Sequence, residues 1–496
     1  MTAAGPEGLY QAVRAVADRR PDACAIQRTD GGTAGYAELL GLADRIAGGL
    51  AERGVRAGDC VAYALRGGIG YVALILATAR LGAHYVPLLT GFSEPEAKEA
   101  LRLTRPVLLV TDPATPADTT APARRAVPAD APAAVPLDRL ASAEPLADDT
   151  PAHTGVFRVL WSSGSTGFPK GIAWRQDTFV RERRRWIADT AIRDTDVVFC
   201  RHTLDVAHAT DLHVFAALLS GARLVLADPD APPRVLLHQL VRYRATVMSA
   251  LPRHYEELAD AAAPGTDLAG IRRALCGGAY LSPAVTRRAR ETLGLRIREI
   301  YGSTEFGLAL GDMADGPAGD GLAPVARVGV RIAPLPGAPG TSGTPDTGEL
   351  VLRSDCTSEG YLEQDAANAR TFRAPEFWTG DMAHRTADGR YRILGRLTDA
   401  LATPAGPVLA PVLDEEIEAT GAVAEAVSLP LHPGAYRNEV LVAVRPRGSV
   451  AEASTAARAV LRRHGLHGRV EPVDAVPRTE VGKVDKPSLR ARLGLT

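Results

Sequence analysis

The sequence predicts an α/β fold in which a large N-terminal domain of parallel and mixed sheets, flanked by helices, precedes a smaller α+β domain. Short apolar runs alternate with longer amphipathic stretches along most of the chain. Strands that alternate with helices are typical of parallel sheets covered by helices. The clearest segments are expected strands at 107–111, 197–200 and 223–227, and expected helices at 10–17 and 36–53.

Two regions rich in small residues and proline interrupt this alternation. The segment 112–154 is rich in Ala, Pro, Asp and Thr, so we expect a surface excursion with room for one short strand. The segment 311–347 is rich in Gly and Pro and predicts the hairpins and loops of a β-rich subdomain.

A domain boundary is expected at Gly395–Leu397. An acidic helix at 414–420 and a β-rich run at 440–444 follow it, and together they suit a compact α+β domain. The predicted division is residues 1–395, a hinge at 396–398, and a C-terminal domain at 399–496.

Charge and hydropathy exclude several classes of partner. The 496 residues carry a formal net charge of −1, with a sequence pI of about 6.8, so neither nucleic acid nor an anionic membrane is an expected partner. The most apolar stretch, 71–89, is interrupted by Arg80 and His84. It predicts a buried helix and strand rather than a membrane span.

The cysteines and the N-terminus favour a cytoplasmic protein. Five cysteines are scattered without a C-x-x-C pair, so neither a disulfide framework nor a zinc site is expected; they are Cys24, Cys60, Cys200, Cys276 and Cys356. The start MTAAGPEGLY lacks the basic and apolar regions of a signal peptide.

The most specific local signal is the string 162–171, which reads SSGSTGFPKG and directly follows the apolar run 156–161. Its glycines allow tight turns and close approach of the backbone to a ligand. Because Lys170 is followed by Gly171, the string differs from the phosphate loop G-x-x-x-x-G-K-[ST]. Its hydroxyls, N–H groups and lysine still predict an anion-binding loop formed by Ser163, Gly164, Ser165, Thr166, Gly167 and Lys170.

This string resembles a loop of the acyl-adenylate-forming superfamily, which includes acyl- and aryl-CoA synthetases, peptide-synthetase adenylation domains and firefly luciferase. Further motifs of the superfamily follow in the same order over nearly the whole chain. They are Gly277-Gly278-Ala279, Tyr301–Glu305, Thr379–Asp381, Gly395-Arg396 and Thr479–Lys483. The resemblance implies an enzyme that uses ATP and Mg²⁺ to convert an acid into an acyl-AMP, with release of pyrophosphate.

The resemblance also implies roles for the residues that meet the triphosphate. The Ser/Gly loop would hold the β- and γ-phosphates, and Thr304 would contact the α-phosphate. Glu305 would hold Mg²⁺, which prefers one or two carboxylates together with phosphate oxygens. Lys483 would bridge the attacking carboxylate and the α-phosphate. A mobile point charge suits a group that arrives for one step and leaves for the next.

Other motifs are expected to hold the nucleoside. Tyr301 and Gly302 would enclose the adenine against the backbone of Gly278 and Ala279. Asp381 would accept hydrogen bonds from both ribose hydroxyls. Arg396 would assist at the ribose or at the phosphates.

The hinge departs from the superfamily pattern. After adenylation the C-terminal domain would rotate about the hinge and replace Lys483 with a surface for acyl transfer. Relatives often carry Asp or Lys where this chain has Thr398, and Ala402 replaces a common lysine. Adenylation need not suffer from these changes, but they leave open whether the acyl acceptor is a thiol or an amine.

The acyl pocket has two possible alignments. Amino-acid-activating relatives carry an Asp that binds the substrate ammonium. When the alignment is counted back from residues 218–221 without a gap, His208 takes the position of this Asp. With a three-residue gap, Asp205 takes that position instead. We favour the ungapped alignment, which disfavours an α-amino acid because His208 is not a permanent anion. The other expected wall residues are small or apolar and suit a flat aryl or short acyl group: Ala209, Leu212, Leu275, Gly277, Ile300 and Leu308.

The leading interpretation is a ligase that forms a thioester with CoA or with the phosphopantetheine of a carrier protein supplied in trans. The alternatives are an amide synthetase, in which an amine attacks the acyl-AMP directly, and adenylation of an unusual acid such as nitrite. A nucleotide-binding module without catalysis is disfavoured by Glu305 and Lys483. The candidate catalytic residues are therefore Lys483, Glu305, Thr304 and His208.

Overall fold

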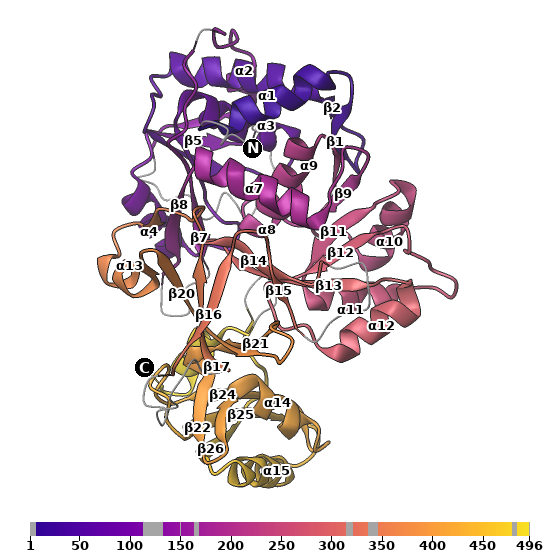
Figure 1. Cartoon of the computed structure of the whole chain (residues 1–496), viewed down its shortest axis with the longest axis vertical. Helices are drawn as coiled ribbons and strands as arrows, with labels where there is room; N and C mark the ends of the chain where they lie inside the picture. The colour runs from indigo at the N-terminus through magenta and orange to yellow at the C-terminus, as the bar shows by residue number, and fades with distance from the viewer. Residues whose placement is uncertain are drawn as a thin grey trace.

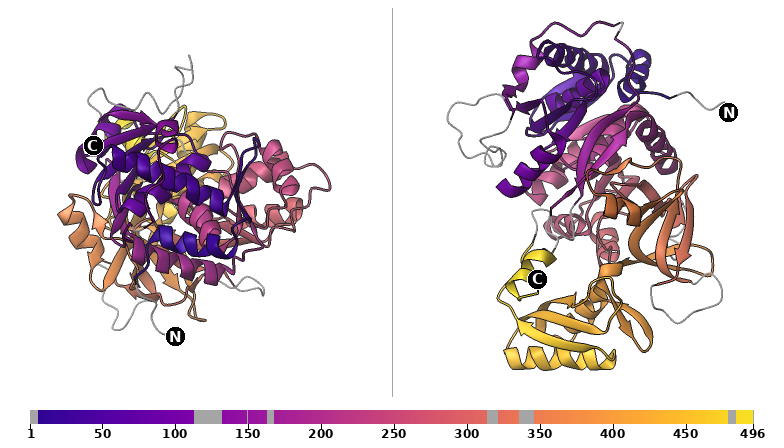
Figure 2. Two further views of the ribbon diagram at one scale, coloured as in Figure 1. Left: turned by 90° about the horizontal axis from the view of Figure 1, so that it is seen from above. Right: turned by 90° about the vertical axis from the view of Figure 1, so that its left-hand side faces the viewer.

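The computed structural model describes residues 6–112, 132–148, 150–162, 168–313, 321–335, 346–478 and 484–495. The molecule is elongated, with the N-terminal elements at one end and the elements after residue 400 at the other (Figure 1). Two further views show the same separation between the ends from the side and the compact outline from above (Figure 2).

A seven-stranded sheet carries the phosphate-loop strand. Its order is β18-β8-β7-β4-β3-β5-β6, with β7 and β8 antiparallel and the β3, β4 and β5 pairs parallel. The strands are β3 (Cys60–Ala64), β4 (His84–Pro87), β5 (Leu108–Thr111), β6 (Ala134–Pro136), β7 (Val156–Ser162), β8 (Lys170–Arg175) and β18 (Gly360–Tyr361).

A nine-stranded sheet lies next to it, in the order β15-β14-β13-β12-β11-β9-β10-β1-β2. The run from β13 to β1 is parallel, and β14, β15 and β2 are antiparallel to their neighbours. The strands are β1 (Cys24–Arg28), β2 (Thr33–Gly35), β9 (Val197–Cys200), β10 (Arg223–Leu226), β11 (Val247–Ala250), β12 (Arg273–Cys276), β13 (Ile297–Ser303), β14 (Gly307–Gly311) and β15 (Ala323–Pro324).

Helices separate and cover the two sheets in layers. The largest core lies between the sheets around α1, α2, α3, α7 and α9, whereas α4 covers the far face of the first sheet and α10, α11 and α12 that of the second. The helices are α1 (Leu9–Arg19), α2 (Tyr36–Glu52), α3 (Ile69–Leu81), α4 (Glu94–Thr104), α6 (Leu137–Ala141), α7 (Gln176–Thr190), α8 (Ala207–Ala209), the π-helix η1 (Thr210–Val214), α9 (Phe215–Ser220), α10 (Pro233–Arg242), α11 (Pro252–Ala261) and α12 (Pro283–Leu293).

Strand β9 shows why these runs are continuously apolar. Val198 and Cys200 belong to the core between the sheets, while Val197 and Phe199 belong to the core beneath α10 to α12. Successive side chains of a strand point to opposite faces, and both faces of this sheet are covered. A parallel strand buried on both faces therefore needs apolar residues at every position.

An antiparallel sheet follows, as the β-rich region predicts. Its order is β16-β17-β20-β19, with β21 paired to β20. The elements are β16 (Gly329–Ala333), β17 (Thr347–Arg353), α13 (Asp365–Thr371), β19 (Phe372–Arg373), β20 (Glu376–Arg385) and β21 (Tyr391–Arg396).

The elements after Arg396 pack around a core of their own. They are η2 (Leu397–Asp399), β22 (Ala400–Thr403), β23 (Gly406–Leu409), α14 (Ala410–Glu418), β24 (Val423–Pro430), β25 (Glu439–Pro446), α15 (Val450–Arg463), β26 (His467–Pro472) and α16 (Lys486–Arg492). Strands β22 and β23 form a hairpin, and β24, β25 and β26 form a sheet. The division into domains at a hinge of residues 396–398 stays a prediction.

The α/β fold class is confirmed. Strand β13 runs to Ser303, because its last residues pair with β14. Helix α14 begins at Ala410, with a proline in its first turn, rather than at residue 414. The apolar stretch 71–89 forms most of α3 and all of β4, and no helix within the described ranges is long and apolar enough to cross a membrane.

Candidate active site

The carboxyl ends of β9, β11, β12 and β13 meet at one edge of the nine-stranded sheet. The chain leaves β9 for β10 on one side and then crosses to β11 on the other side. In open parallel sheets, ligands bind outside the carboxyl ends of the strands where the strand order reverses. The region beyond β9 and β11 is therefore the expected ligand site.

Three residues from separate motifs meet at the nucleotide end of this edge. Tyr301, at the carboxyl end of β13, donates a hydrogen bond from its hydroxyl to Asp381 Oδ2 on β20. Arg396 lies opposite Asp381 across the β20–β21 pair, with Nε 3.1 Å from Oδ1. Burial, and then the negative charge of Asp381, raise the pKa of Tyr301 well above its usual range. Asp381 is thus a buried carboxylate held between a phenol and a guanidinium.

The end of β12 requires glycine. A Cβ at Gly277 would lie 2.8 Å from Ile300 Cγ1, so a side chain there would push β12 and β13 apart. Gly278 has φ +82°, in the left-handed region that favours glycine. Gly278 and Ala279 are exposed beside the end of β13, so their backbone is open to a flat ligand next to Tyr301.

Glu305 lies in the turn between β13 and β14, where Tyr361 links it to Lys170. The Tyr361 hydroxyl donates to Glu305 Oε1 at 3.0 Å, and Lys170 Nζ lies 4.6 Å from the centroid of the Tyr361 ring. Burial lowers the pKa of Lys170, and the Glu305 charge opposes that shift. The neighbouring Thr304 carbonyl accepts a hydrogen bond from Trp174 Nε1 at 2.7 Å.

Two predicted loops fall outside the described residues, although their flanks are defined. Ser162 pairs with Lys170 across β7 and β8, so the two ends of the phosphate loop are adjacent. Arg478 and Val484 form a bridge that closes the ends of the loop 479–483. The residues that lie outside are Ser163, Gly164, Ser165, Thr166, Gly167 and Lys483.

Histidines gather around Ser249 at the reversal of strand order between β9 and β11. His208 Nε2 lies 3.0 Å from Ser249 Oγ, and His202 Nε2 lies 3.1 Å from Ser249 O. His213 Nδ1 lies 3.0 Å from the His208 carbonyl, which can only accept a hydrogen bond. His213 Nε2 lies 3.1 Å from the Ser249 carbonyl oxygen and 3.2 Å from the Ser249 nitrogen, so both ring nitrogens face backbone groups.

This histidine cluster (His202, His208, His213 and His254) is packed ring against ring. The centroid of the His202 ring is 4.5 Å from that of His208 and 5.3 Å from that of His254. Burial lowers the pKa of His213 to about 4, and burial together with nearby arginines lowers that of His254 to about 3. Burial also lowers the pKa of His202 well below its usual range. These three rings are neutral at pH 7.

Ring nitrogens of His202, His208 and His213 face groups of Ser249, and His254 Nε2 accepts a hydrogen bond from Arg253 Nε at 3.3 Å. No group of three or more His, Cys, Asp or Glu side chains in the described ranges is arranged to hold a metal ion. Asp381 and Glu305 are carboxylates that accept hydrogen bonds from the tyrosine hydroxyls of Tyr301 and Tyr361 respectively.

Asp205, the alternative amine-binding residue, is engaged elsewhere. Its Oδ2 accepts hydrogen bonds from the Thr90 N–H at 2.8 Å and the Thr90 hydroxyl at 3.0 Å. The residue is 7% exposed, so this carboxylate holds the segment before α8 against the loop that follows β4.

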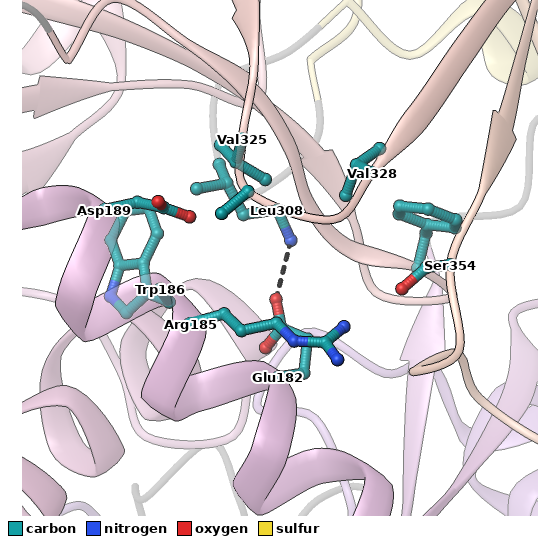
Figure 3. A pocket seen from close by; sticks show the side chains of 10 residues that line it. Glu182, Arg185, Trp186, Asp189, Leu308, Val325, Val328 and Ser354 are labelled. Atoms are coloured by element: carbon teal, nitrogen blue, oxygen red, sulfur yellow. Dashed lines mark hydrogen bonds between the residues drawn. The ribbon is translucent and has the colours of Figure 1, made fainter. Parts of the chain in front are cut away.

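The expected wall residues are mostly part of the core between the sheets. Ala209, Leu275 and Ile300 belong to it, and Leu212 packs against it. Leu308 also lines a pocket on the side of α7, near Glu182 and Trp186 (Figure 3). Whether these side chains contact an acid stays a prediction.

Sequence reasoning missed several residues of this region. His202, His213 and His254 follow no helical or strand period that would group them with His208, because they come from a strand end, a π-helix and α11. Tyr361 follows a glycine in an exposed-looking turn, and only its contacts with Lys170 and Glu305 reveal it.

Comparison with known proteins decides the family. The model of the family described as AMP-binding enzyme matches residues 13–362. The chain belongs to the AMP-binding enzyme family. The resemblance inferred from its motifs is thereby confirmed.

Two relatives of this AMP-binding enzyme align with it over nearly their whole length. Triostin synthetase I of Streptomyces triostinicus is 31% identical, over 97% of this chain and 93% of that protein. Feruloyl-CoA synthase of Amycolatopsis sp is 29% identical, over 96% of each.

Solved structures share the fold. ATP-bound MatB from Rhodopseudomonas palustris has a TM-score of 0.83 at 23% identity and covers 98% of both chains. The amide bond synthetase McbA from Marinactinospora thermotolerans has a TM-score of 0.79 at 25% identity, over 98% of this chain and 99% of that one. The protein is an ATP-dependent, AMP-forming ligase that activates a small acid as an acyl-AMP.

Proposed function

We propose that this AMP-binding enzyme activates an aryl acid, or another small acid without an α-amino group. The acyl group then passes to the thiol of CoA or to the phosphopantetheine of a carrier protein. The choice of acid and the choice of acceptor depend on different observations.

The proposed choice of acid is based on the histidine cluster. It lies where the strand order reverses, and burial keeps His202, His213 and His254 uncharged. An ammonium buried there without a carboxylate partner would cost several kcal/mol. Asp205 is held through its Oδ2 by Thr90, and its buried Oδ1 has no hydrogen-bond partner among the described residues, so the acid panel below decides whether it binds an ammonium. An acid with a flat, neutral body avoids this cost.

The nucleotide would be held by the other end of the site. Asp381 would accept the ribose hydroxyls, with Tyr301 beside the adenine and Arg396 beside the phosphates. Glu305 fits a Mg²⁺ site, since this ion uses one or two carboxylates together with phosphate oxygens. Bound Mg²⁺ would neutralise phosphate charge. Lys170 adds a positive charge next to Tyr361.

An amine acceptor is the second candidate. Ala402 lies on β22 where relatives often carry a lysine, and the chain is similar to the amide bond synthetase McbA along its whole length. In this candidate an amine nitrogen attacks the acyl carbon of the acyl-AMP, and AMP leaves.

Pyrophosphate release across a panel of acids tests the proposal. Aryl and aliphatic acids without an α-ammonium should give higher kcat/KM than the proteinogenic amino acids. The reaction is then repeated with CoA and with amines, and the product identifies the acceptor. A clear preference for an α-amino acid would refute the choice of acid.

A lysine substitution separates the two half-reactions. Lys483→Ala should slow acyl-AMP formation by about 10²-fold, the scale for loss of one charged contact in a transition state. The variant should still consume premade acyl-AMP. Lys98→Ala is the matched control, because Lys98 pairs with Glu94 on the exposed face of α4. Equal loss in both half-reactions would remove Lys483 from the adenylation step.

A further inference from the structure

Four charged side chains form a buried network beneath the site. Arg158 is 0% exposed, Arg183 1%, Glu182 5% and Asp211 8%. Charged residues are almost never this deeply buried unless they are paired. The two arginines and two carboxylates balance in charge, and they come from β7, α7 and η1.

The contacts run through the network without a break. Both Nη atoms of Arg158 donate to the carboxylate of Asp211, Nη2 to Oδ2 at 2.8 Å. Arg183 Nη1 donates to the Asp211 carbonyl at 3.0 Å and pairs with the Glu182 carboxylate. Although burial opposes it, the Arg158 charge holds the pKa of Asp211 below its usual value.

The far end of the network reaches the hairpin of Glu305. Glu182 Oε1 accepts a hydrogen bond from the Leu308 N–H at 2.9 Å, drawn as the dashed line in Figure 3. Gly307 has φ +82°, and a Cβ there would collide with the Glu182 carboxylate. The hairpin therefore has a glycine where Glu182 approaches it.

Each branch of the network ends on a segment of the site. Strand β7, which carries Arg158, runs directly into the phosphate loop. Asp211 is three residues after His208, and Leu308 is three residues after Glu305. One connected set of charges thus holds the phosphate strand, the acyl-side helix and the hairpin of the predicted metal carboxylate.

Stability alone is a weak reason for such a network. Replacing a buried ion pair by apolar side chains of similar volume is often neutral or stabilising, whereas removing one partner is strongly destabilising. The bidentate contact between Arg158 and Asp211 also fixes relative orientation, which a nondirectional apolar contact does not.

We propose that Arg158, Asp211, Arg183 and Glu182 are positioning residues that hold these three segments in the arrangement required for adenylation. The proposal depends on the roles given to Lys170, Glu305 and His208 under the proposed function. It does not depend on the identity of the acid.

The test replaces the ion pair as a unit. The double variant Arg158→Met with Asp211→Leu should keep a thermal unfolding midpoint near that of the wild type. Its kcat for pyrophosphate release should fall by about 10- to 100-fold, since small misplacements of reacting groups cost about that much. The Kd for AMP should change less than 3-fold, because Tyr301, Asp381 and Arg396 lie outside the network.

The matched control is Arg80→Met with Asp44→Leu. Arg80 is 4% exposed and pairs with Asp44, but this pair joins α3 to α2 and reaches no segment of the site. Its kcat should stay within 2-fold of the wild-type value.

A second measurement needs no substrate. Hydrogen exchange at 156–162 and 300–311 should be faster in the Arg158/Asp211 double variant, and unchanged there in the control. If that double variant unfolds, Arg158→Lys, which keeps the charge but loses the bidentate contact, replaces it with the same expected readouts. A folded variant with wild-type kcat and wild-type exchange overturns the positioning role. A wild-type enzyme that rejects acids without an α-ammonium overturns only the proposed function.

Discussion

The two ends of the candidate site differ in how they handle charge. At the nucleotide end, Asp381 is held by Tyr301 and by the guanidinium of Arg396. At the acyl end, His202, His213 and their neighbours surround Ser249, and burial removes their charge.

The proposed roles of the two ends account for this difference. A nucleotide presents hydroxyls and phosphates in a fixed geometry, which charged donors and acceptors recognise well. A neutral acyl group offers no fixed charge, so its site can discriminate by the desolvation cost that it imposes on charged competitors. The comparison predicts that charge changes at the two ends have different consequences.

The largest effect is expected at the nucleotide end. Asp381→Ala should lower kcat/KM for ATP by about 10²-fold or more, since truncating a buried charged partner costs about 2–5 kcal/mol. The KM for the acid should change little. The measurement is pyrophosphate release at varied ATP. The control is Asp388→Ala in the exposed turn between β20 and β21, and equal losses in both variants would contradict the assignment.

A smaller loss is expected at the acyl end. His208→Asp should reduce kcat/KM for the preferred acid by about 10- to 100-fold, because a carboxylate would face the uncharged acyl body at a cost of several kcal/mol. His238→Asp, on the exposed side of α10, is the control. The gapped alignment would instead be right if the wild type prefers an α-amino acid and Asp205→Ala, but not His208→Asp, abolishes that activity.

The neutrality of the cluster predicts a loss of stability in acid. The folded-state pKa of His213 is about 4 and that of His254 about 3, both below the ordinary 6.5, so the unfolded chain binds more protons between these values. The contribution of these neutral rings to the free energy of unfolding is fully present above pH 6.5, and it falls as the pH decreases towards 4. At pH 5 each ring should lower the free energy of unfolding by about 2 kcal/mol relative to its value above pH 6.5.

Urea unfolding at pH 7, 6 and 5 measures this effect. His213→Asn should make the free energy of unfolding less dependent on pH than in the wild type. His432→Gln serves as the control, because His432 is an exposed residue that pairs with Glu439. Identical pH dependence in the wild type and His213→Asn would show that His213 is not a buried neutral base.

The smallest effect is expected far from both ends. Burial raises the pKa of Asp414 on α14 from 3.8 to about 7. The contribution of Asp414 to the free energy of unfolding therefore decreases as the pH rises from 3.8 to about 7, and it stays constant at higher pH. Asp414→Asn should therefore be more stable than the wild type at pH 8, by on the order of 1 kcal/mol, because Lys486 offsets part of the buried charge.

Thermal unfolding at pH 4 and pH 8 checks this expectation, with Glu415→Gln on the exposed side of α14 as the control. A gain at pH 8 that disappears at pH 4 would show that burial neutralises charge outside the site as well. Neutrality alone would then not identify a ligand site. The position of the histidine cluster beyond β9 and β11 would remain its distinguishing feature.

The sequence by itself determined the family, the fold class and the motifs of the predicted nucleotide end. Strings such as 162–171 and 301–305 place their polar groups through covalent spacing, so a local pattern is enough to predict them. Apolar runs in strands buried on both faces likewise predicted β5, β9 and β10. The hydrogen bond from Tyr301 to Asp381 brings two such motifs together, while their roles in binding a nucleotide stay a prediction.

Only the tertiary structure decided the acyl end. Asp205 is bound by Thr90, 115 residues away, and His254 meets His202 only because β11 lies next to β9. Tyr361 likewise comes between Lys170 and Glu305 only after three strands have assembled. No local spacing encodes such contacts, because they depend on which distant strands become neighbours. The charge of a histidine depends in turn on how completely those neighbours exclude water.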